Sequence, residues 1–147
     1  MHARKDTPPV KILMVEDDNG HARLIEKNLR RAGINNPLMH FESGDEFIDF
    51  FFDDVKIDLG EQPYAVFLDL NLPGTDGYEI LRRIKNDSSR HKVPVIVLTT
   101  TSNPGEVDRC YELGCNMYIT KPIDYDNFGD AMNKLALMLS IVKMPNG

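Results

Sequence analysis

Three reactive residues in this sequence each stand at the end of an apolar run. They are the carboxylate Asp69, the hydroxyl Thr99 and the lysine Lys121. A carboxylate is costly to bury in an apolar strand, and a Pro/Gly turn comes shortly after Asp69, so the strand is expected to deliver this acid to the rim of a sheet. Ligands of open α/β folds bind at that rim, which favours a chemical role for Asp69.

Consecutive acids follow the first apolar run of the chain, at Glu16, Asp17 and Asp18. If the strands are parallel, their carboxyl ends share one edge, and these acids converge with Asp69. Carboxylates that lie so close together repel one another, and a hard divalent cation removes that repulsion. Mg²⁺ suits such a site because it takes few carboxylates and keeps several water ligands. The other interpretation is that Asp17 and Asp18 only cap the following helix.

A carboxylate, a metal, a lysine and a hydroxyl together are typical of a site that receives a phosphoryl group. Asp69 would attack phosphorus while Mg²⁺ and Lys121 offset charge on the equatorial oxygens, and Thr99 would donate a hydrogen bond. Each of these residues alone has an ordinary structural interpretation. Their convergence at one edge of the sheet is what predicts the chemistry.

Alternating strand and helix patterns supply the frame that would position these residues. Strands are predicted over residues 11–15, 38–41, 64–69, 93–99 and 116–120. Helices are predicted from the turn at 16–19 to Gly33, and over residues 43–52, 77–85, 103–114 and 124 to about 143. Repeated strand-then-helix units predict an α/β fold with a parallel sheet covered by helices on both faces.

The spacing of apolar residues predicts which face of each helix is buried. The expected inward residues are Leu24, Ile25, Leu29 and Ala32 in the first helix, Phe47, Ile48 and Phe51 in the second, and Ile80, Leu81 and Ile84 in the third. Residues 53–63 are mostly polar and predict a longer connection than is usual between a helix and a strand.

Composition and charge exclude several classes of protein. The chain has 147 residues, 41% of them hydrophobic, which suits one globular domain with a single core. The net charge of -6 argues against nonspecific binding to nucleic acid or to anionic membranes. No membrane-spanning or secretory segment is recognisable, and Cys110 and Cys115 are interpreted as reduced thiols of a cytoplasmic protein. A loose tail over residues 1–9 and a single domain over 10–147, without an output domain, are expected.

Four motifs resemble the receiver domain of two-component response regulators, over about residues 10 to 143. They are V-E-D-D at 15–18, F-L-D-L-N-L-P at 67–73, V-P-V-I-V-L-T-T at 93–100 and Y-I-T-K-P at 118–122. The resemblance implies a flavodoxin-like sheet of strand order 2-1-3-4-5 with five helices. It also implies that a sensor histidine kinase phosphorylates Asp69, and that the protein is no enzyme beyond slow self-catalysed phosphorylation and dephosphorylation.

The resemblance also implies a metal-ligand set. Asp17 resembles a direct Mg²⁺ ligand, and Glu16 resembles a ligand that acts through metal-bound water. Asp69 and the backbone carbonyl of Asn71 would complete the ligands from the protein. Glu16 stands where Asp is more frequent in the family, and its longer side chain fits the water-mediated role.

Two further positions resemble the parts of the family that respond to the phosphoryl group. Thr99 resembles the switch hydroxyl and Tyr118 the aromatic switch residue, while Lys121 resembles the phosphate-binding lysine. Taken without the resemblance, Tyr118 would be interpreted as ordinary packing.

The last predicted helix carries a second apolar line besides its inward stripe. Leu137, Ile141 and Met144 lie on roughly the opposite side at about 100° per residue. They are either scattered surface apolar residues or part of an interface, and we favour a homodimer through this helix. The whole-chain pattern is similar to single-domain regulators paired with bacterial phytochrome histidine kinases, which implies a light-regulated phosphoryl donor and an output through protein contacts.

Two other classes of protein share parts of this pattern. A phosphatase of the haloacid dehalogenase type also uses an aspartyl nucleophile, but it needs a second Asp two residues later, and Asn71 stands there. A flavodoxin-like flavin carrier would need a phosphate-binding loop after the first strand, where the acids at 16–18 would repel phosphate.

Overall fold

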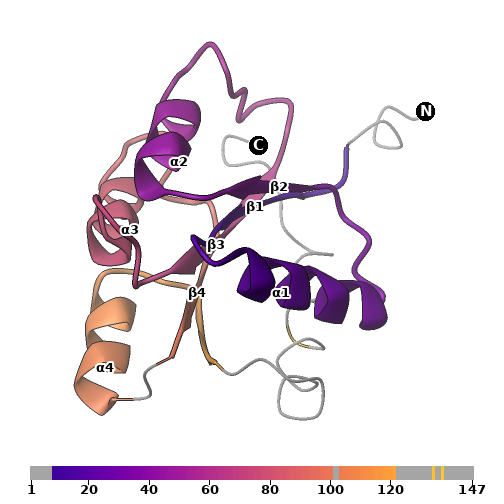
Figure 1. Ribbon diagram of the computed structural model, residues 1–147. Coiled ribbons are helices and arrows are strands. Elements are labelled where there is room, and N and C mark those ends of the chain that lie inside the picture. The colour runs from indigo at the N-terminus through magenta and orange to yellow at the C-terminus, as the bar shows by residue number, and fades with distance from the viewer. Residues whose placement is uncertain (1–7, 101–102, 122–133, 135–136, 138–147) are drawn as a thin grey trace.

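The protein forms a parallel sheet covered by helices (Figure 1). The computed structural model describes residues 8–100, 103–121, 134 and 137. The strands are β1 (Lys11–Val15), β2 (Leu38–Phe41), β3 (Tyr64–Asp69), β4 (Val95–Thr99) and β5 (Met117–Thr120). All neighbouring pairs are parallel and the order is β2-β1-β3-β4-β5. The predicted α/β class and strand order are therefore confirmed.

The described helices all begin at capped positions. They are α1 (Asn19–Arg31), α2 (Gly44–Phe51), α3 (Gly77–Lys85) and α4 (Pro104–Glu112). The side chains of Asp18, Ser43, Asp76 and Asn103 accept hydrogen bonds from first-turn backbone N–H groups. The helix predicted over 124–143 falls almost wholly outside the described residues, within which Lys134 and Leu137 are helical.

Two apolar layers hold the helices against the sheet. Because successive strand residues point to opposite faces, Leu13 and Val15 join the core beneath α2, α3 and α4, while Ile12 and Met14 join the core beneath α1. Figure 1 shows the same division, with α1 on one side of the sheet and the other three labelled helices on the other. The central strands β1, β3 and β4 are buried on both faces, as expected of a parallel sheet, whereas the edge strands β2 and β5 are partly exposed.

The prediction that Leu24 faces the core is wrong. Leu24 is 41% exposed, whereas Ile25 and Leu29 are fully buried and Ala32 packs against the same core. The residue that completes this face is Ala22, three positions before Ile25, because residues three and four apart share a helix face. On α2 and α3, the expected burial of Phe47, Phe51, Ile80, Leu81 and Ile84 is confirmed, and Ile48 is partly buried.

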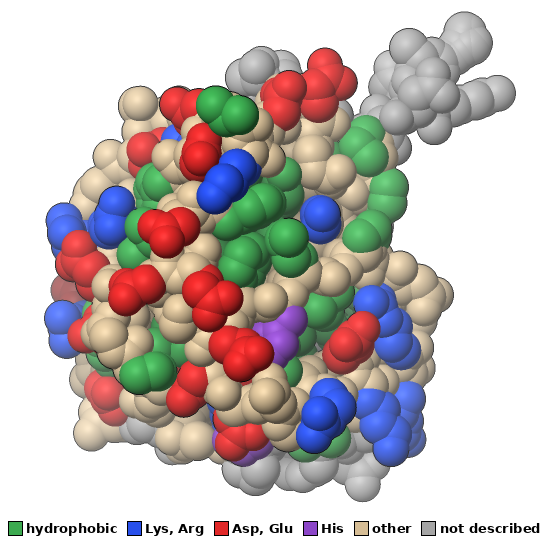
Figure 2. All heavy atoms as spheres, turned by 45° about the horizontal axis from the view of Figure 1, so that its top comes forward, with side chains coloured by type: hydrophobic (Ala, Val, Ile, Leu, Met, Phe, Trp, Pro, Cys, Tyr) green, Lys and Arg blue, Asp and Glu red, His purple; other side chains and the backbone are tan. Residues whose placement is uncertain are grey.

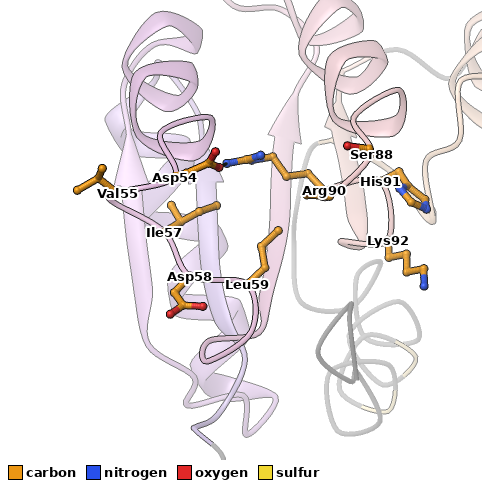
Figure 3. A pocket seen from close by; sticks show the side chains of 10 residues that line it. Asp54, Val55, Ile57, Asp58, Leu59, Ser88, Arg90, His91 and Lys92 are labelled. Atoms are coloured by element: carbon orange, nitrogen blue, oxygen red, sulfur yellow. Dashed lines mark hydrogen bonds and ion pairs between the residues drawn. The ribbon is translucent and has the colours of Figure 1, made fainter.

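The long connection over 53–63 is anchored rather than loose. Ile57 packs into the core, and Gln62 donates to the carbonyl oxygens of Pro9 and Pro63. The connection forms one wall of a surface pocket, and residues 88–92 form the other wall (Figure 3). Arg90 crosses between the two walls and reaches Asp54.

Arg90 is a buried cation whose side-chain N–H groups donate hydrogen bonds to several segments of the chain. Its Nε donates to the Phe51 carbonyl at 2.6 Å, and its two terminal nitrogens bond Asp54 at 2.6 Å and Asp87 at 3.4 Å. The guanidinium also lies 5.2 Å from the centre of the Phe52 ring. Arg90 therefore ties the end of α2 and the 53–63 connection to the turn before β4.

We expect Arg90→Met to lower the free energy of unfolding by about 2 kcal/mol, because the change leaves the Phe51 carbonyl without the Nε donor and removes the ion pairs with Asp54 and Asp87. Urea unfolding followed by circular dichroism measures the difference. Arg82→Met is the control, since Arg82 forms an exposed pair with Glu79 and should cost less than about 1 kcal/mol. Equal midpoints for the two variants would contradict the assigned role of Arg90.

No helix of the described residues combines the length and the apolar character needed to cross a lipid bilayer.

Candidate functional site

The carboxyl ends of four neighbouring strands bring the predicted residues together. Glu16 directly follows β1, Asp69 ends β3, Thr99 ends β4 and Lys121 directly follows β5. Strand register sets the positions of these residues along the strand direction, since Asp69 pairs with Leu98 and Thr99 pairs with Thr120. All four side chains are buried, so these polar groups are largely shielded from solvent at the sheet edge.

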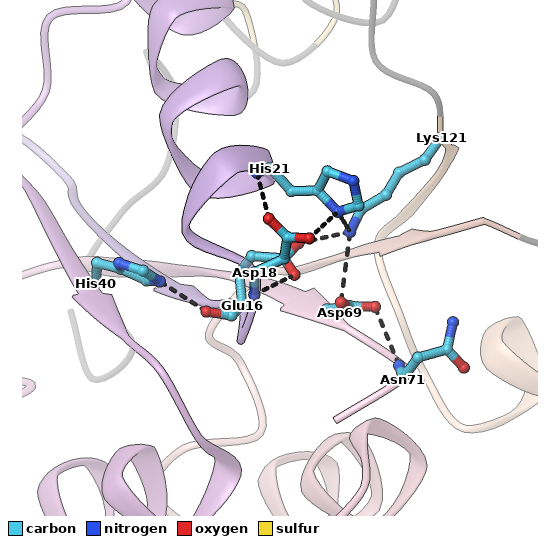
Figure 4. A network of polar contacts seen from close by, with 7 residues as sticks. All are labelled: Glu16, Asp18, His21, His40, Asp69, Asn71 and Lys121. Carbon is cyan, nitrogen blue, oxygen red and sulfur yellow. Dashed lines mark hydrogen bonds and ion pairs between the residues drawn. The ribbon is translucent and has the colours of Figure 1, made fainter. Parts of the chain in front are cut away.

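The ammonium group of Lys121 is at the centre of the polar contacts (Figure 4). Its Nζ lies 2.5 Å from Glu16 Oε1 and 3.4 Å from Asp69 Oδ2. The same Nζ lies 3.3 Å from Nδ1 of His21, in the first turn of α1. Lys121 thereby offsets the charge of two buried carboxylates at once.

Backbone N–H groups orient the two buried carboxylates. The N–H of Asn71 donates to Asp69 Oδ1 at 3.0 Å, and the N–H of Asp18 donates to Glu16 Oε2 at 3.2 Å. Each carboxylate thus keeps its other oxygen for Lys121. This division leaves Asp69 Oδ2 facing the cation instead of the backbone.

An acidic cluster beside Lys121 has the geometry of a metal site. Glu16, Asp17 and Asp69 each offer a carboxylate oxygen, and these oxygens lie within 4.8 Å of one another. Asp17 is exposed, whereas the other two are buried. A set of carboxylate oxygens is suited to a hard divalent cation such as Mg²⁺. Asp18 is different, because its side chain caps α1 through the N–H of His21, so the capping interpretation holds for this acid.

Glu16 is an acid of the cluster whose ionisation is affected by burial. Burial raises the pKa of Glu16 to about 7, and the neighbouring Asp69 carboxylate adds to this rise, although Lys121 acts in the opposite direction. The contact with Lys121 therefore does not offset the desolvation of the Glu16 carboxyl. A bound divalent cation would lower this pKa, because it favours the ionised carboxylate.

The remaining predicted residues lie at different depths. Tyr118 is half-buried, packs against the core beneath α2–α4, and pairs in register with Val97. Burial raises the pKa of the Tyr118 phenol to about 12, so the ring carries its hydroxyl proton at neutral pH. Leu137 is 65% exposed, in line with a surface position, whereas Ile141 and Met144 lie outside the described residues.

The sequence prediction missed two histidines at this site. His21 contacts Lys121, and Nε2 of His40 lies 2.7 Å from the carbonyl oxygen of Glu16. Neither histidine has the spacing of a metal ligand in the sequence, so no motif predicts a role for it. The signal for His21 was its place in the first turn of the helix that follows the acidic motif, since such a turn lies beside the carboxyl end of its strand.

Gly77 brings the start of α3 directly against the end of β3. A Cβ at this position would lie 2.6 Å from the Asp69 carbonyl oxygen and 2.6 Å from Leu70 Cα. The Gly77 N–H also donates to the Leu70 carbonyl. The helix therefore contacts the backbone that carries Asp69, without a side chain between them.

Comparison with protein families decides which family this chain belongs to. The family model for the response regulator receiver domain matches residues 12–133. The chain belongs to the response regulator receiver domain family. This match favours a receiver over the phosphatase, and it agrees with the acidic cluster, the strand-end Asp and the lysine at one edge of the sheet.

Individual receivers resemble this chain over most of its length. Response regulator Rcp1 of Synechocystis sp. is 36% identical over 117 residues, which cover 80% of each chain. The structure of the Mn²⁺-bound form of Rcp1 superposes with a TM-score of 0.74, covering 93% of this chain and 99% of that one. A receiver domain from Rhodospirillum rubrum is 46% identical with a TM-score of 0.77, covering 92% of this chain and 97% of that one. The phosphorylated cyanobacterial phytochrome response regulator RcpA is 29% identical with a TM-score of 0.75, covering 93% and 99%.

We expect Asp17→Asn to weaken Mg²⁺ binding by about tenfold or more, because the exposed member of the acidic cluster loses its charge while the chain keeps its shape. Isothermal titration calorimetry at neutral pH measures the change. Asp18→Asn is the matched control, since Asn also caps helices well and Asp18 is not in the cluster. If both variants bound Mg²⁺ as the unmodified receiver does, the metal would not be held by this cluster.

Proposed function

We propose that this receiver accepts a phosphoryl group on Asp69 from the phosphohistidine of a sensor kinase. The observation that carries the proposal is the 3.4 Å approach of Lys121 Nζ to Asp69 Oδ2 beside an acidic cluster. A carboxylate oxygen next to a fixed cation is a suitable nucleophile for phosphorus when the charge on the phosphoryl oxygens is also balanced.

Each residue has a distinct part in the proposed transfer. Asp69 Oδ2 forms the bond to phosphorus as the bond to the leaving imidazole nitrogen breaks, while the Asn71 N–H holds Oδ1. The Lys121 ammonium moves from Asp69 to a phosphoryl oxygen, and Thr99, at the end of β4, donates its hydroxyl to another. Glu16, Asp17, Asp69 and the Asn71 carbonyl would hold Mg²⁺, which when bound supplies positive charge to the equatorial oxygens.

The protein is expected to signal through a change of conformation on phosphorylation, and not through catalytic turnover of a substrate. Tyr118 and Thr99 lie on adjacent strands, and we propose that engagement of Thr99 by the phosphoryl group changes the packing of the Tyr118 ring. Self-catalysed phosphorylation from small donors and slow hydrolysis are part of this proposal. The altered surface would then be recognised by a protein partner.

We further propose a phytochrome-type histidine kinase as the phosphoryl donor. Similarity to RcpA, a phytochrome response regulator, supports this pairing. The test uses purified histidine kinases of the source organism that carry radiolabelled phosphate. Only the cognate kinase should transfer its phosphoryl group to this receiver within seconds. A phytochrome kinase should change that transfer between red and far-red light, and transfer only from a kinase that does not respond to light would refute the pairing.

A protein partner, and not nucleic acid, fits the surface and the charge. Asp and Glu side chains lie around an apolar area on the face that Figure 2 shows, and the chain has a net charge of -6. We propose a cytoplasmic location, where Cys110 and Cys115 remain free thiols, and a homodimer through the segment of Leu137, Ile141 and Met144. Replacing Leu137 and Ile141 with Glu should halve the mass measured by sedimentation, and an unchanged mass would count against this interface.

A further inference from the structure

Lys121 is held by three groups that come from three different elements. An ammonium group has three N–H donors, and its Nζ has Glu16, His21 and Asp69 as acceptors at 2.5, 3.3 and 3.4 Å. Two of these acceptors belong to the acidic cluster, and His21 does not. Of these three contacts, the one with the histidine ring is therefore independent of the acidic cluster.

We propose that His21 is a positioning residue, whose imidazole Nδ1 accepts a hydrogen bond from Lys121 and directs the ammonium group toward Asp69. Where phosphoryl transfer is concerned, the inference rests on the proposed function. It adds a residue from α1 to a site whose other groups lie at strand ends (Figure 4).

The backbone around His21 fixes where its ring can lie. Its N–H donates to Asp18 Oδ1 at 3.0 Å, and Nδ1 lies 3.9 Å from Asp18 Oδ2. The cap of α1 thus sets the position of the first turn, and the side chain projects over the end of β1 toward Lys121. For Nδ1 to accept from an ammonium group, the ring proton must be on Nε2, which the half-exposed ring can offer to water.

His21 matters because the other contacts of Lys121 change during the proposed reaction. A cation bound by Glu16 and Asp69 competes with the ammonium group for the negative charge of the same two carboxylates. His21 is outside that competition, so it can hold the ammonium group of Lys121 near Asp69 while Glu16 and Asp69 bind the metal. Without it, the long lysine side chain would regain rotamers that point away from the phosphoryl group.

Substitution of His21 tests the proposal in two independent measurements. The first is hydrogen exchange of the Lys121 NH₃⁺ group in metal-free protein, seen by ¹⁵N-edited NMR and assigned by its loss in Lys121→Met. The second is the acetyl phosphate concentration that gives half-maximal phosphorylation with saturating Mg²⁺. Mg²⁺ affinity itself is measured alongside by calorimetry.

His21→Ala should speed the ammonium exchange and raise the half-maximal acetyl phosphate concentration, each by about fivefold or more, as expected from the loss of one charge-assisted hydrogen bond. His21→Asn should restore both values to within about twofold, because the carboxamide oxygen can stand near the position of Nδ1. Arg23→Ala, an exposed change two residues along α1, should leave both values and the Mg²⁺ affinity unchanged.

Unchanged ammonium exchange in His21→Ala would overturn the proposal, and so would a failure of His21→Asn to restore the two values. A fivefold loss of Mg²⁺ affinity in His21→Ala would also overturn it, because that loss would point to a general disturbance of the cluster. If the unmodified protein took up no phosphoryl group at all, the proposed function would fail instead. The ammonium exchange, which needs no phosphodonor, would still decide whether His21 holds Lys121.

Discussion

Asp69→Asn is expected to abolish phosphoryl uptake. The amide keeps the size of the carboxylate and can still accept the hydrogen bond from the Asn71 N–H, but it lacks the anionic oxygen that would attack phosphorus. Incubation with acetyl phosphate and Mg²⁺ should add one acid-stable, base-labile phosphoryl group to the unmodified chain. Intact-protein mass spectrometry should find less than about 1% of that product in the variant, a loss of at least 100-fold.

The control for this change is Asp76→Asn. Asp76 caps α3 through the Glu79 N–H, and Asn serves that purpose as well, so both the fold and the phosphorylation should persist. Retention of the phosphoryl group in Asp69→Asn would show that another residue accepts it. Loss in both variants would show that the effect is not specific to the site.

The second large effect is expected from Gly77→Ala. Its new Cβ would lie 2.6 Å from two backbone atoms, the Asp69 carbonyl oxygen and Leu70 Cα, and backbone cannot rotate away as the end of a side chain can. Either α3 or the end of β3 must move, which should cost about 3 kcal/mol of unfolding free energy and displace the carboxylate from Lys121. We expect a lower urea midpoint and, under conditions where the variant is still folded, phosphorylation slowed by at least about tenfold.

Gly105→Ala is the matched change at the start of α4. Among the described residues, the added Cβ would meet the side-chain oxygen of Asn103 alone, at 3.2 Å. Since alanine favours helix by up to about 1 kcal/mol over glycine, this variant should be as stable as the parent or slightly more so. Equal destabilisation of the two variants would show that helix starts in general, and not the approach of α3 to β3, are sensitive.

Local patterns were sufficient to predict the strands and most helices. Apolar runs that are buried on both faces, and apolar residues three and four apart, are properties of a short stretch of chain. The limits of such patterns are visible at Leu24, where one side chain beyond the edge of the apolar stripe is exposed. They are also visible at Arg90, whose polar type suggests a surface position although packing buries it.

What the sequence determined by itself is the set of reactive residues at strand ends, because a parallel sheet places every carboxyl end at one edge whatever the details of packing. What only the tertiary structure decided is which of these groups contact one another there. Lys121 and Glu16 are separated by 105 positions along the chain, and their 2.5 Å contact depends on the exact register of β1, β3, β4 and β5. The partnership of His21 with Lys121 and the close approach of Gly77 to β3 likewise arise from how helices pack on strands, which no local spacing encodes.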